Sequence, residues 1–340
     1  MNRTRSLRRS ALFVALVAVL VGVSLASADA SRSAFQALPP GATIIAGVPV
    51  PNDGPVTIGQ GSVWVVDREG GALRNGVPLG RLYRIDPRTV RLKDVIPHVT
   101  GGSATVADGM VWISSFVLDR LLRVDPVSHR VTRIKTGPDD QPGTLNILSA
   151  AGKLWVTNHH DGTVAVVDPA TSQVTATVPV FRTGCCGAQA LTTDGTSVWV
   201  TIPGADLSES AIVRIDAAAH TVTSTFTGVP DGPCGGLAIA VGKLWSTASD
   251  CDGQGVMKVD PVTNTLADYF HRAGVPGDVL SAFGSIWIAT RDPDALVRID
   301  PMTDAVVGSL PLPADTWNMA ADSNRLWVRV QGAVLDIAPQ

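Results

Sequence analysis

Hydrophobic and polar residues alternate in short runs along the chain, and small turn-forming residues separate the runs. Between Gly235 and Phe270 the runs GGLAIAVG, KLWSTAS, GVMKVDP and NTLADYF follow one another. Alternation with a period of two is typical of strands that bury one face. This segment therefore predicts a small sheet of four strands.

A tryptophan stands in the second run of each such unit and recurs at intervals of 40 to 48 residues. The seven positions are Trp64, Trp112, Trp155, Trp199, Trp245, Trp287 and Trp327. Sheets repeated at this spacing are typical of propeller blades, because a single small sheet cannot bury its face alone. The pattern predicts an all-β fold, a seven-bladed β-propeller of four-stranded blades. We expect the Trp residues to pack blade against blade.

An aspartate ends the third strand of six units, and proline follows it in five of them. The positions are Asp86, Asp125, Asp168, Asp216, Asp260 and Asp300, with Ala217 in place of Pro after the fourth. Pro presets φ in a tight turn and Asp caps the turn, so we interpret these acids as structural. A basic residue precedes the Asp by two positions in five units: Arg84, Arg123, Arg214, Lys258 and Arg298. We expect this basic set to form surface ion pairs around the rim.

The seventh unit supplies only three strands. The segment from Thr43 to Pro51 resembles an outer strand, TATVPVF, of the third unit. We expect Thr43 to Val50 to pair with Ala333 to Ile337, closing the ring with an N-terminal outer strand and removing an unpaired edge. Residues 42–340 then form a single propeller after a short lead at 29–41.

Residues 1–28 have the layout of a secretory signal peptide: four Arg, an apolar run from Ala11 to Leu25, and Ala26-Ser27-Ala28 as a cleavage site. The alternative is an uncleaved membrane anchor, since the run nearly reaches the ~18 residues that a bilayer needs. No later apolar run is long enough to span a membrane. The signal predicts a secreted or extracytoplasmic protein.

Without residues 1–28, 23 Lys and Arg remain against 30 Asp and Glu, a net charge of −7. An acidic surface repels phosphate backbones, so nucleic acid is excluded as a partner. We expect a monomer that binds a small molecule or a protein.

The segment LWVTNHHDGTVAVVDPATSQVTATVPV, which ends at Val180, resembles the YVTN family of β-propeller repeats, with Trp155 in the Tyr position. Other units are similar to propellers of the streptogramin B lyase type, and together the resemblance covers about residues 42–338. It implies a propeller fold. The lyases carry a catalytic His in a Pro-His-Gly-like step that opens an inner strand. The corresponding steps here, CCGAQA, PCGGLA and PGDVLS, contain no His, so the lyase chemistry is not carried over.

The loops after the second and outer strands are long and polar, and in a propeller they gather on one face around the central channel. Binding residues concentrate on such loops. Our candidates for ligand binding on this loop face are Arg74, Asp140, His159, His160, Asp206, Asp252, Arg291 and Trp317.

Several candidates have a second interpretation. His159 and His160 could bind a metal or transfer protons, or could be solvated loop residues. The step DCDG resembles the start of a calcium loop, but Pro261 stands where an EF-hand needs Glu. Trp317 could stack a ligand or fill the gap between blades. No motif requires a cofactor, and we predict no metal site and no catalytic residue.

Four cysteines lie in the exported part, where oxidation is expected. Hairpin numbering in the fifth unit places Cys234 opposite Cys251, within reach of a disulfide. Cys185 and Cys186 have no cysteine partner in their own unit, so they are free thiols, a vicinal disulfide, or part of a different pairing with the fifth unit. Cys186 with Cys234 is the main competitor of the Cys234–Cys251 bond.

The sequence thus predicts an exported propeller that binds a small molecule or a protein on its polar loop face, without an identifiable catalysis. The alternative is a lyase or hydrolase of the streptogramin-lyase-like type, with its site at the channel mouth. A third class is a structural envelope protein, which would lack a concave polar mouth. Carboxylates and His converging at the channel would favour an enzyme.

Overall fold

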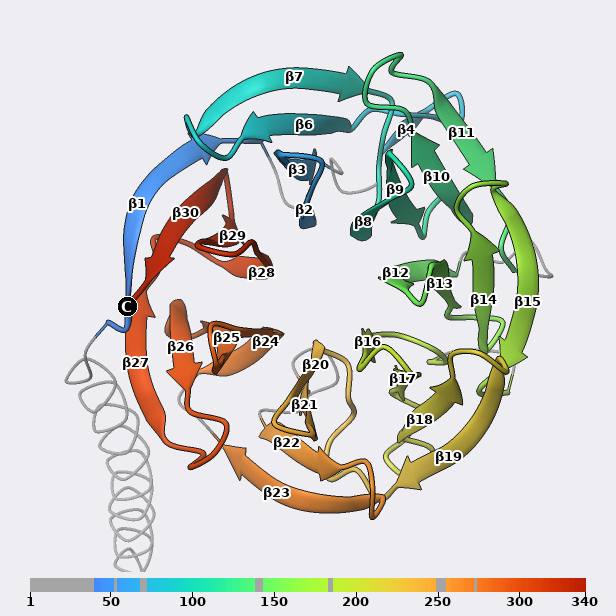
Figure 1. Ribbon diagram of the computed structural model, residues 1–340, viewed down its shortest axis with the longest axis vertical. Helices are drawn as coiled ribbons and strands as arrows, with labels where there is room; N and C mark the ends of the chain where they lie inside the picture. Colours follow the sequence, from blue (N-terminus) through green and yellow to red (C-terminus); the bar gives the residue numbers. More distant parts are fainter. Residues whose placement is uncertain are drawn as a thin grey trace, which may run out of the picture. The chain divides into compact units, whose positions relative to one another are not determined.

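Seven four-stranded antiparallel sheets form a closed ring around a central channel (Figure 1). The computed structural model describes residues 40–340 except 52–53, 68–71, 138–142, 183–185, 249–254 and 272–273, and except the side chains of His271 and Trp317. The predicted signal peptide and most of the lead lie outside the described residues. The inner strands of neighbouring blades contact each other all the way around the ring. The prediction of a seven-bladed all-β propeller is therefore confirmed.

The blades follow one another in chain order, each from its inner to its outer strand. Blade 1 consists of β2 (Val56–Gly59), β3 (Ser62–Asp67), β6 (Arg81–Asp86) and β7 (Arg91–Pro97). Blade 2 consists of β8 (Ser103–Ala107), β9 (Met110–Ser115), β10 (Arg120–Val124) and β11 (Val131–Ile134). Blade 3 consists of β12 (Thr144–Ala150), β13 (Lys153–Asn158), β14 (Thr163–Asp168) and β15 (Gln173–Pro179). Blade 4 consists of β16 (Leu191–Thr193), β17 (Ser197–Ile202), β18 (Ala211–Asp216) and β19 (Thr221–Thr227).

Blade 5 consists of β20 (Leu237–Ala240), β21 (Lys243–Thr247), β22 (Gly255–Asp260) and β23 (Thr265–His271). Blade 6 consists of β24 (Val275–Ala282), β25 (Ser285–Arg291), β26 (Ala295–Ile299) and β27 (Val306–Pro311). Blade 7 consists of β28 (Thr316–Ala321), β29 (Leu326–Val330), β30 (Ala333–Pro339) and, as its outer strand, β1 (Ala42–Pro49). A separate two-stranded hairpin, β4 (Leu73–Arg74) and β5 (Val77–Pro78), lies in the segment predicted as a long loop of the first unit.

The N-terminal strand closes the ring as the sequence predicts. β1 runs antiparallel to β30, with Thr43 opposite Ala338 and Val48 opposite Val334. The fully buried Arg329 of β29 reinforces this seam, because its Nη2 donates to the carbonyl oxygens of Val50 (3.3 Å) and Pro51 (3.0 Å). A single side chain thus joins the last blade to the strand that opens the propeller.

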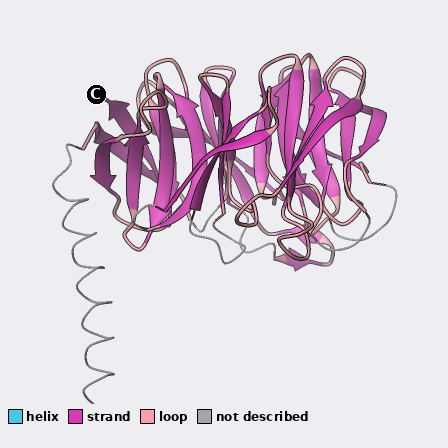
Figure 2. Cartoon of the chain, turned by 90° about the horizontal axis from the view of Figure 1, so that it is seen from below, coloured by secondary structure: helices cyan, strands magenta, loops and turns pink. Residues whose placement is uncertain are grey.

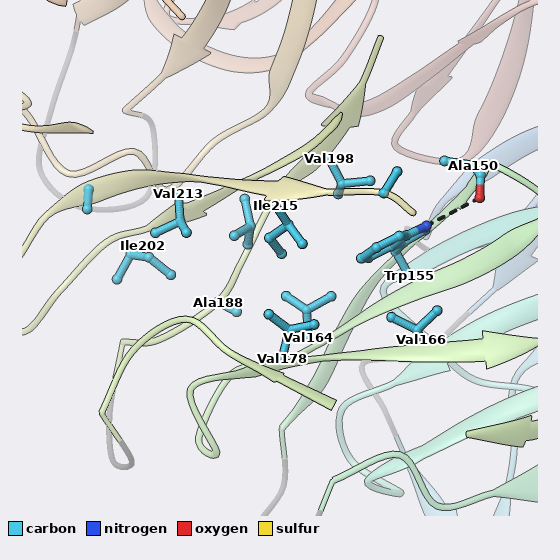
Figure 3. Close-up of a cluster of buried hydrophobic side chains, with 13 residues drawn as sticks. Ala150, Trp155, Val164, Val166, Val178, Ala188, Val198, Ile202, Val213 and Ile215 are labelled. Carbon is cyan, nitrogen blue, oxygen red and sulfur yellow. Dashed lines mark hydrogen bonds between the residues drawn. The ribbon is translucent and has the colours of Figure 1, made fainter. Parts of the chain in front are cut away.

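All seven repeat tryptophans are buried, at most 3 % exposed, which confirms the predicted core position. Trp155 shows the arrangement: it packs among Val164, Val166 and Val198 between blades 3 and 4, and its Nε1 donates to the Ala150 carbonyl over 3.2 Å (Figure 3). The hydrogen bond satisfies the one polar atom of the indole. Burial of this ring then contributes to stability without leaving a polar group unpaired.

The six Asp residues that end the third strands cap the following turns, as predicted. In each turn Asp Oδ1 accepts from the backbone N–H groups two and three residues later; for Asp86 the donors are Arg88 (2.9 Å) and Thr89 (3.2 Å). These backbone hydrogen bonds lower the pKa of Asp86 below its ordinary value. The acids therefore shape the hairpins.

The prediction of rim ion pairs for the basic set was wrong for most of its members. Each of the five basic groups instead lies over the Trp ring of its own blade, 4.9 to 5.9 Å from the centroid. In three of them Nε also donates to a serine that begins the second strand, as Arg84 does to Ser62 over 2.8 Å. The strand pairing places the basic residue directly opposite the Trp, which favours a cation–π contact over a partner in solvent. Only Lys258 also forms an ion pair in the described part of the chain, with Asp304 at 2.6 Å.

Figure 2 shows the strands running between two layers of loops. The described residues contain no helix with the length and apolar character needed to cross a membrane.

Candidate binding site at the channel mouth

One position of each blade lies at or near the start of its inner strand, nine residues before the repeat Trp, and in six blades this position lines the mouth of the central channel. The inner strand pairs with the second strand so that Trp stands opposite the residue seven positions earlier, for example Leu148 opposite Trp155. The position two residues before that partner lies within three residues of the start of the inner strand in every blade. The resulting channel positions are Pro55, Ser103, Asn146, Ala190, Gly236, Asp278 and Asn318.

Six of these seven channel positions line one cavity of about 260 Å³; Pro55 is not among its lining residues. Other polar groups on its wall come from Gln189, Arg291 and Thr316. The wall is formed by the starts of the inner strands. The second and outer strands of each blade end on this same face of the propeller. The site therefore lies on the face that the loop pattern predicts.

Small hydroxyl side chains hold the inner strands in position behind this wall. Two residues after the Trp, blades 2 to 5 carry a hydroxyl, on Ser114, Thr157, Thr201 and Thr247. In blade 3, Thr157 Oγ1 accepts from the backbone N–H of Asn146 over 2.8 Å, and blades 4 and 5 repeat this contact. In blade 1 the channel position is Pro55, which has no N–H to satisfy, and an apolar Val66 stands in the hydroxyl position.

Asp278 is the only acidic residue among the channel positions. Its Oδ1 accepts from the backbone N–H of Val279 (2.9 Å), and its Oδ2 accepts from the N–H of Met319 (2.9 Å) and from Asn318 Nδ2 (3.3 Å). Burial raises the pKa of Asp278 to about 7, while the two backbone hydrogen bonds act in the opposite direction. The carboxyl group therefore changes its charge near neutral pH.

Glycine at position 236 makes room for this carboxylate. A Cβ on Gly236 would lie 2.8 Å from Asp278 Oδ1 and 2.6 Å from the backbone nitrogen of Val279. Only a residue without a side chain lets blade 5 approach the acid of blade 6 so closely.

Thr316 supplies a buried hydroxyl in β28, the strand whose Asn318 and Met319 contact Asp278. The residue is 1 % exposed and belongs to the cavity lining, and its hydroxyl has no hydrogen-bond partner among the described residues. Its backbone carbonyl lies near Gly277, the neighbour of Asp278. A buried hydroxyl without a partner costs free energy.

The mouth around Arg291, which lines the cavity, carries charge of both signs. Arg291 ends β25, and Asp292, Asp294 and Asp315 stand on the adjoining loops. Burial raises the pKa of Asp294, and a hydrogen bond with Asp315 raises it further, whereas the charge of Arg291 lowers it. The acids outnumber the single guanidinium at this part of the mouth.

Among the candidates from the sequence whose side chains the structure describes, only Arg291 lines the cavity. Arg74 is exposed on β4, away from the cavity wall, and exposed Asp206 accepts from Ser208 N (2.9 Å) to shape its own loop. Asp140 and Asp252 lie outside the described residues. Trp317 lies within inner strand β28, not in a loop, and only its backbone is described.

The two adjacent histidines contact each other and their blade neighbours. His159 Nδ1 donates to the Ala188 carbonyl of the next blade over 3.3 Å, and His160 lies 5.8 Å from the Phe116 ring, centroid to centroid. Burial lowers the pKa of His159, although the Ala188 hydrogen bond opposes this. Neither His lines the channel cavity, and no group of three or more metal-ligating side chains occurs in the described ranges.

Cys234 lies on the cavity wall at 3 % exposure, just before β20. Neither it nor Cys186 is a free thiol. Cys185 and Cys251 lie outside the described residues, so the pairing of Cys234 with Cys251 stays a prediction.

The polar channel residues Ser103, Asn146, Gln189, Asp278 and Asn318 were missed by the sequence interpretation. The signal was available, because aligning the repeats on the Trp and counting back nine residues finds all of them except Gln189, which precedes a channel position by one. The residue type at this position changes from blade to blade, so no repeated motif marks it.

No protein-family model and no curated protein matches the sequence. Solved structures are similar in fold. Virginiamycin B lyase from Staphylococcus aureus superimposes with a TM-score of 0.70 at 14% identity, over 86% of this chain and 98% of that chain. The WD40 β-propeller domain of Doa1 gives 0.66 at 14% identity, over 88% and 98%. Hydrazine synthase of Kuenenia stuttgartiensis gives 0.64 at 12% identity, over 83% and 94%. At these identities the likeness concerns the fold alone: the chain is a seven-bladed β-propeller similar in architecture to these proteins.

Proposed function

We propose that the protein is an exported β-propeller that binds a small polar molecule in the cavity at its channel mouth. The observation that carries the proposal is the convergence of Ser103, Asn146, Asp278 and Asn318, from four different blades, on the wall of one cavity. Amide, hydroxyl and carboxyl groups supply both donors and acceptors in fixed positions. Rigid strands hold them, and such preorganisation favours binding.

The size of the cavity favours a small molecule over a protein partner. At about 260 Å³ it is at or below the lower end of ligand pockets, which span roughly 300–1,000 Å³. Its concave polar wall supports binding over a purely structural role in the envelope.

A screen of small polar compounds by thermal shift tests the proposal, since a ligand that binds only the native state raises the melting temperature. We expect hits whose effect falls in the Asn146→Leu and Gln189→Leu variants, because both remove an amide from the wall. The matched control is Gln173→Leu on the exposed outer strand β15, which should respond like the wild type. Hits that respond equally in all variants would place binding elsewhere and contradict the proposal.

Asp278 supports a second candidate function, a lyase or hydrolase that uses this residue for proton transfer. A carboxyl group with a pKa near 7 is suited to general acid–base work at neutral pH. The candidate predicts that a compound found in the screen is slowly converted by the wild type. Asp278→Asn would then abolish conversion while the compound still binds. Release of unchanged compound by the wild type would exclude it.

Export rests on the layout of residues 1–28. The protein recovered outside the cytoplasm should begin near Asp29 or Ser31, and N-terminal sequencing measures this. An intact Met1 would favour the anchor alternative.

A further inference from the structure

Resting on the proposed function, we infer that the ligand group next to Asp278 is a protonated amine. The inference specifies the chemical class of the ligand group at Asp278, in the cavity that Thr316 also lines.

The first argument is the set of neutral donors around the carboxylate. Val279, Met319 and Asn318 all donate through uncharged N–H groups. A carboxylate offers about four acceptor sites, of which these contacts use three. Burying its charge among neutral groups is costly, and a cation that pairs with it reduces that cost.

The second argument is the orphaned hydroxyl of Thr316. An ammonium group carries three donors and no acceptor. An amine that donates one hydrogen to Asp278 has two left for other acceptors. Thr316 lines the same cavity, and its buried hydroxyl has no hydrogen-bond partner among the described residues.

The third argument is the charge of the rim. Arg291, the one cationic side chain on the cavity wall, interacts electrostatically with Asp294. Asp292 and Asp315 are exposed beside it. The surrounding acids attract a cation toward the mouth and repel an anionic ligand end.

Three compounds with one skeleton separate the possibilities: 2-amino-1,3-propanediol, glycerol and glycerate. They present an ammonium, a hydroxyl or a carboxylate group. Each compound is titrated into the mature protein, which lacks residues 1–28. NMR follows the backbone amides of Val279 and Met319, whose N–H groups donate to Asp278. We expect the amine to shift both signals and to bind at least roughly tenfold more tightly than the other two, the scale of one charged hydrogen bond.

Asp278→Asn should remove the preference for the amine. Asn already occupies the equivalent channel position in blades 3 and 7, so this variant is expected to fold. The control, Asp268→Asn, changes an exposed acid of β23 that likewise accepts from the next backbone N–H, and it should bind like the wild type.

In the wild type, amine binding should weaken roughly tenfold or more from pH 7.5 to pH 5, as the Asp278 carboxylate takes up a proton. The charged groups at this part of the mouth are Arg291, Asp292, Asp294 and Asp315. The Asp278→Asn variant shares all four, so comparison with it isolates the contribution of Asp278.

Equal or tighter binding of glycerol or glycerate overturns the inference, and so does an amine preference that survives Asp278→Asn. In either case the cavity still binds a small polar molecule and the proposed function stands. Failure of all three compounds to shift Val279 and Met319 also overturns the inference, whereas the compound screen decides the proposed function separately.

Discussion

The guanidinium of Arg214 lies over the indole of Trp199, with its Cζ 5.5 Å from the ring centroid, and its Nε donates to Ser197 Oγ over 2.9 Å. The contact joins the second and third strands of blade 4, in which Trp199 stands opposite Arg214. Similar contacts occur in blades 1, 2, 5 and 6.

Replacing Arg214 with Met should lower the free energy of unfolding by about 1–2 kcal/mol, because both the cation–π contact and the hydrogen bond to Ser197 are lost. Urea denaturation measures the change. Arg91→Met, at an exposed position of β7, serves as control and should stay within about 0.5 kcal/mol of the wild type. Equal effects of the two substitutions would show that the stacking contributes nothing.

Trp155→Ala should destabilise the protein by about 3–5 kcal/mol, since the ring is fully buried between blades 3 and 4 and its loss leaves a cavity. Denaturation monitored by circular dichroism gives the value. Val127→Ala, at a side chain 86% exposed, is the control. A loss below about 1 kcal/mol for Trp155 would contradict its role in blade packing.

Asp278 should make the protein more stable as the pH falls from 8 to 5. Its folded pKa of about 7 lies above the ordinary 3.8, so in this range the folded state binds the proton more tightly than the unfolded state. The free energy of unfolding of the wild type relative to Asp278→Asn should therefore increase by about 2–3 kcal/mol between pH 8 and pH 5. His159 changes stability in the opposite direction, because its pKa is lowered, but both proteins share it. A pH-independent difference would show that Asp278 titrates normally.

Arg329→Met should loosen the seam of the ring. The substitution leaves the carbonyl oxygens of Val50 and Pro51 without their donor, at a cost on the order of 3 kcal/mol. Hydrogen exchange should quicken first in β1 and β30. Arg130→Met, at an exposed turn, should leave exchange there unchanged. Uniformly faster exchange in all blades would argue against a local role.

Peptide mapping without reduction tests the cysteines. We expect a fragment that joins Cys234 to Cys251, closing a loop of about 17 residues and stabilising the fold by roughly 3 kcal/mol. A fragment that joins Cys186 to Cys234 would refute this pairing.

The sequence predicted the elements that repeat, because each blade has the same structural requirement and meets it with the same type of residue. Trp155 and its equivalents fill the same space between blades, and Asp86 and its equivalents cap the same turn. The stacking of Arg214 on Trp199 was missed because it depends on which strands pair and in which register. The channel position was missed for the opposite reason: Asp278, Gly236 and Ser103 share a location and no chemistry, so only the closed ring brings them together.

Completion of blade 7 by β1 has a consequence for the order of folding. Almost the whole length of the propeller separates β1 from β30, so the contact that closes the ring has the greatest sequence separation of any in the fold, and loop-closure entropy makes such contacts slow to form. During synthesis β1 is made before any blade, yet it acquires its partner only when the last one exists. Until then it presents an unpaired edge, and Ile44 and Ile45, which stay exposed even in the finished ring, are open to association with other chains.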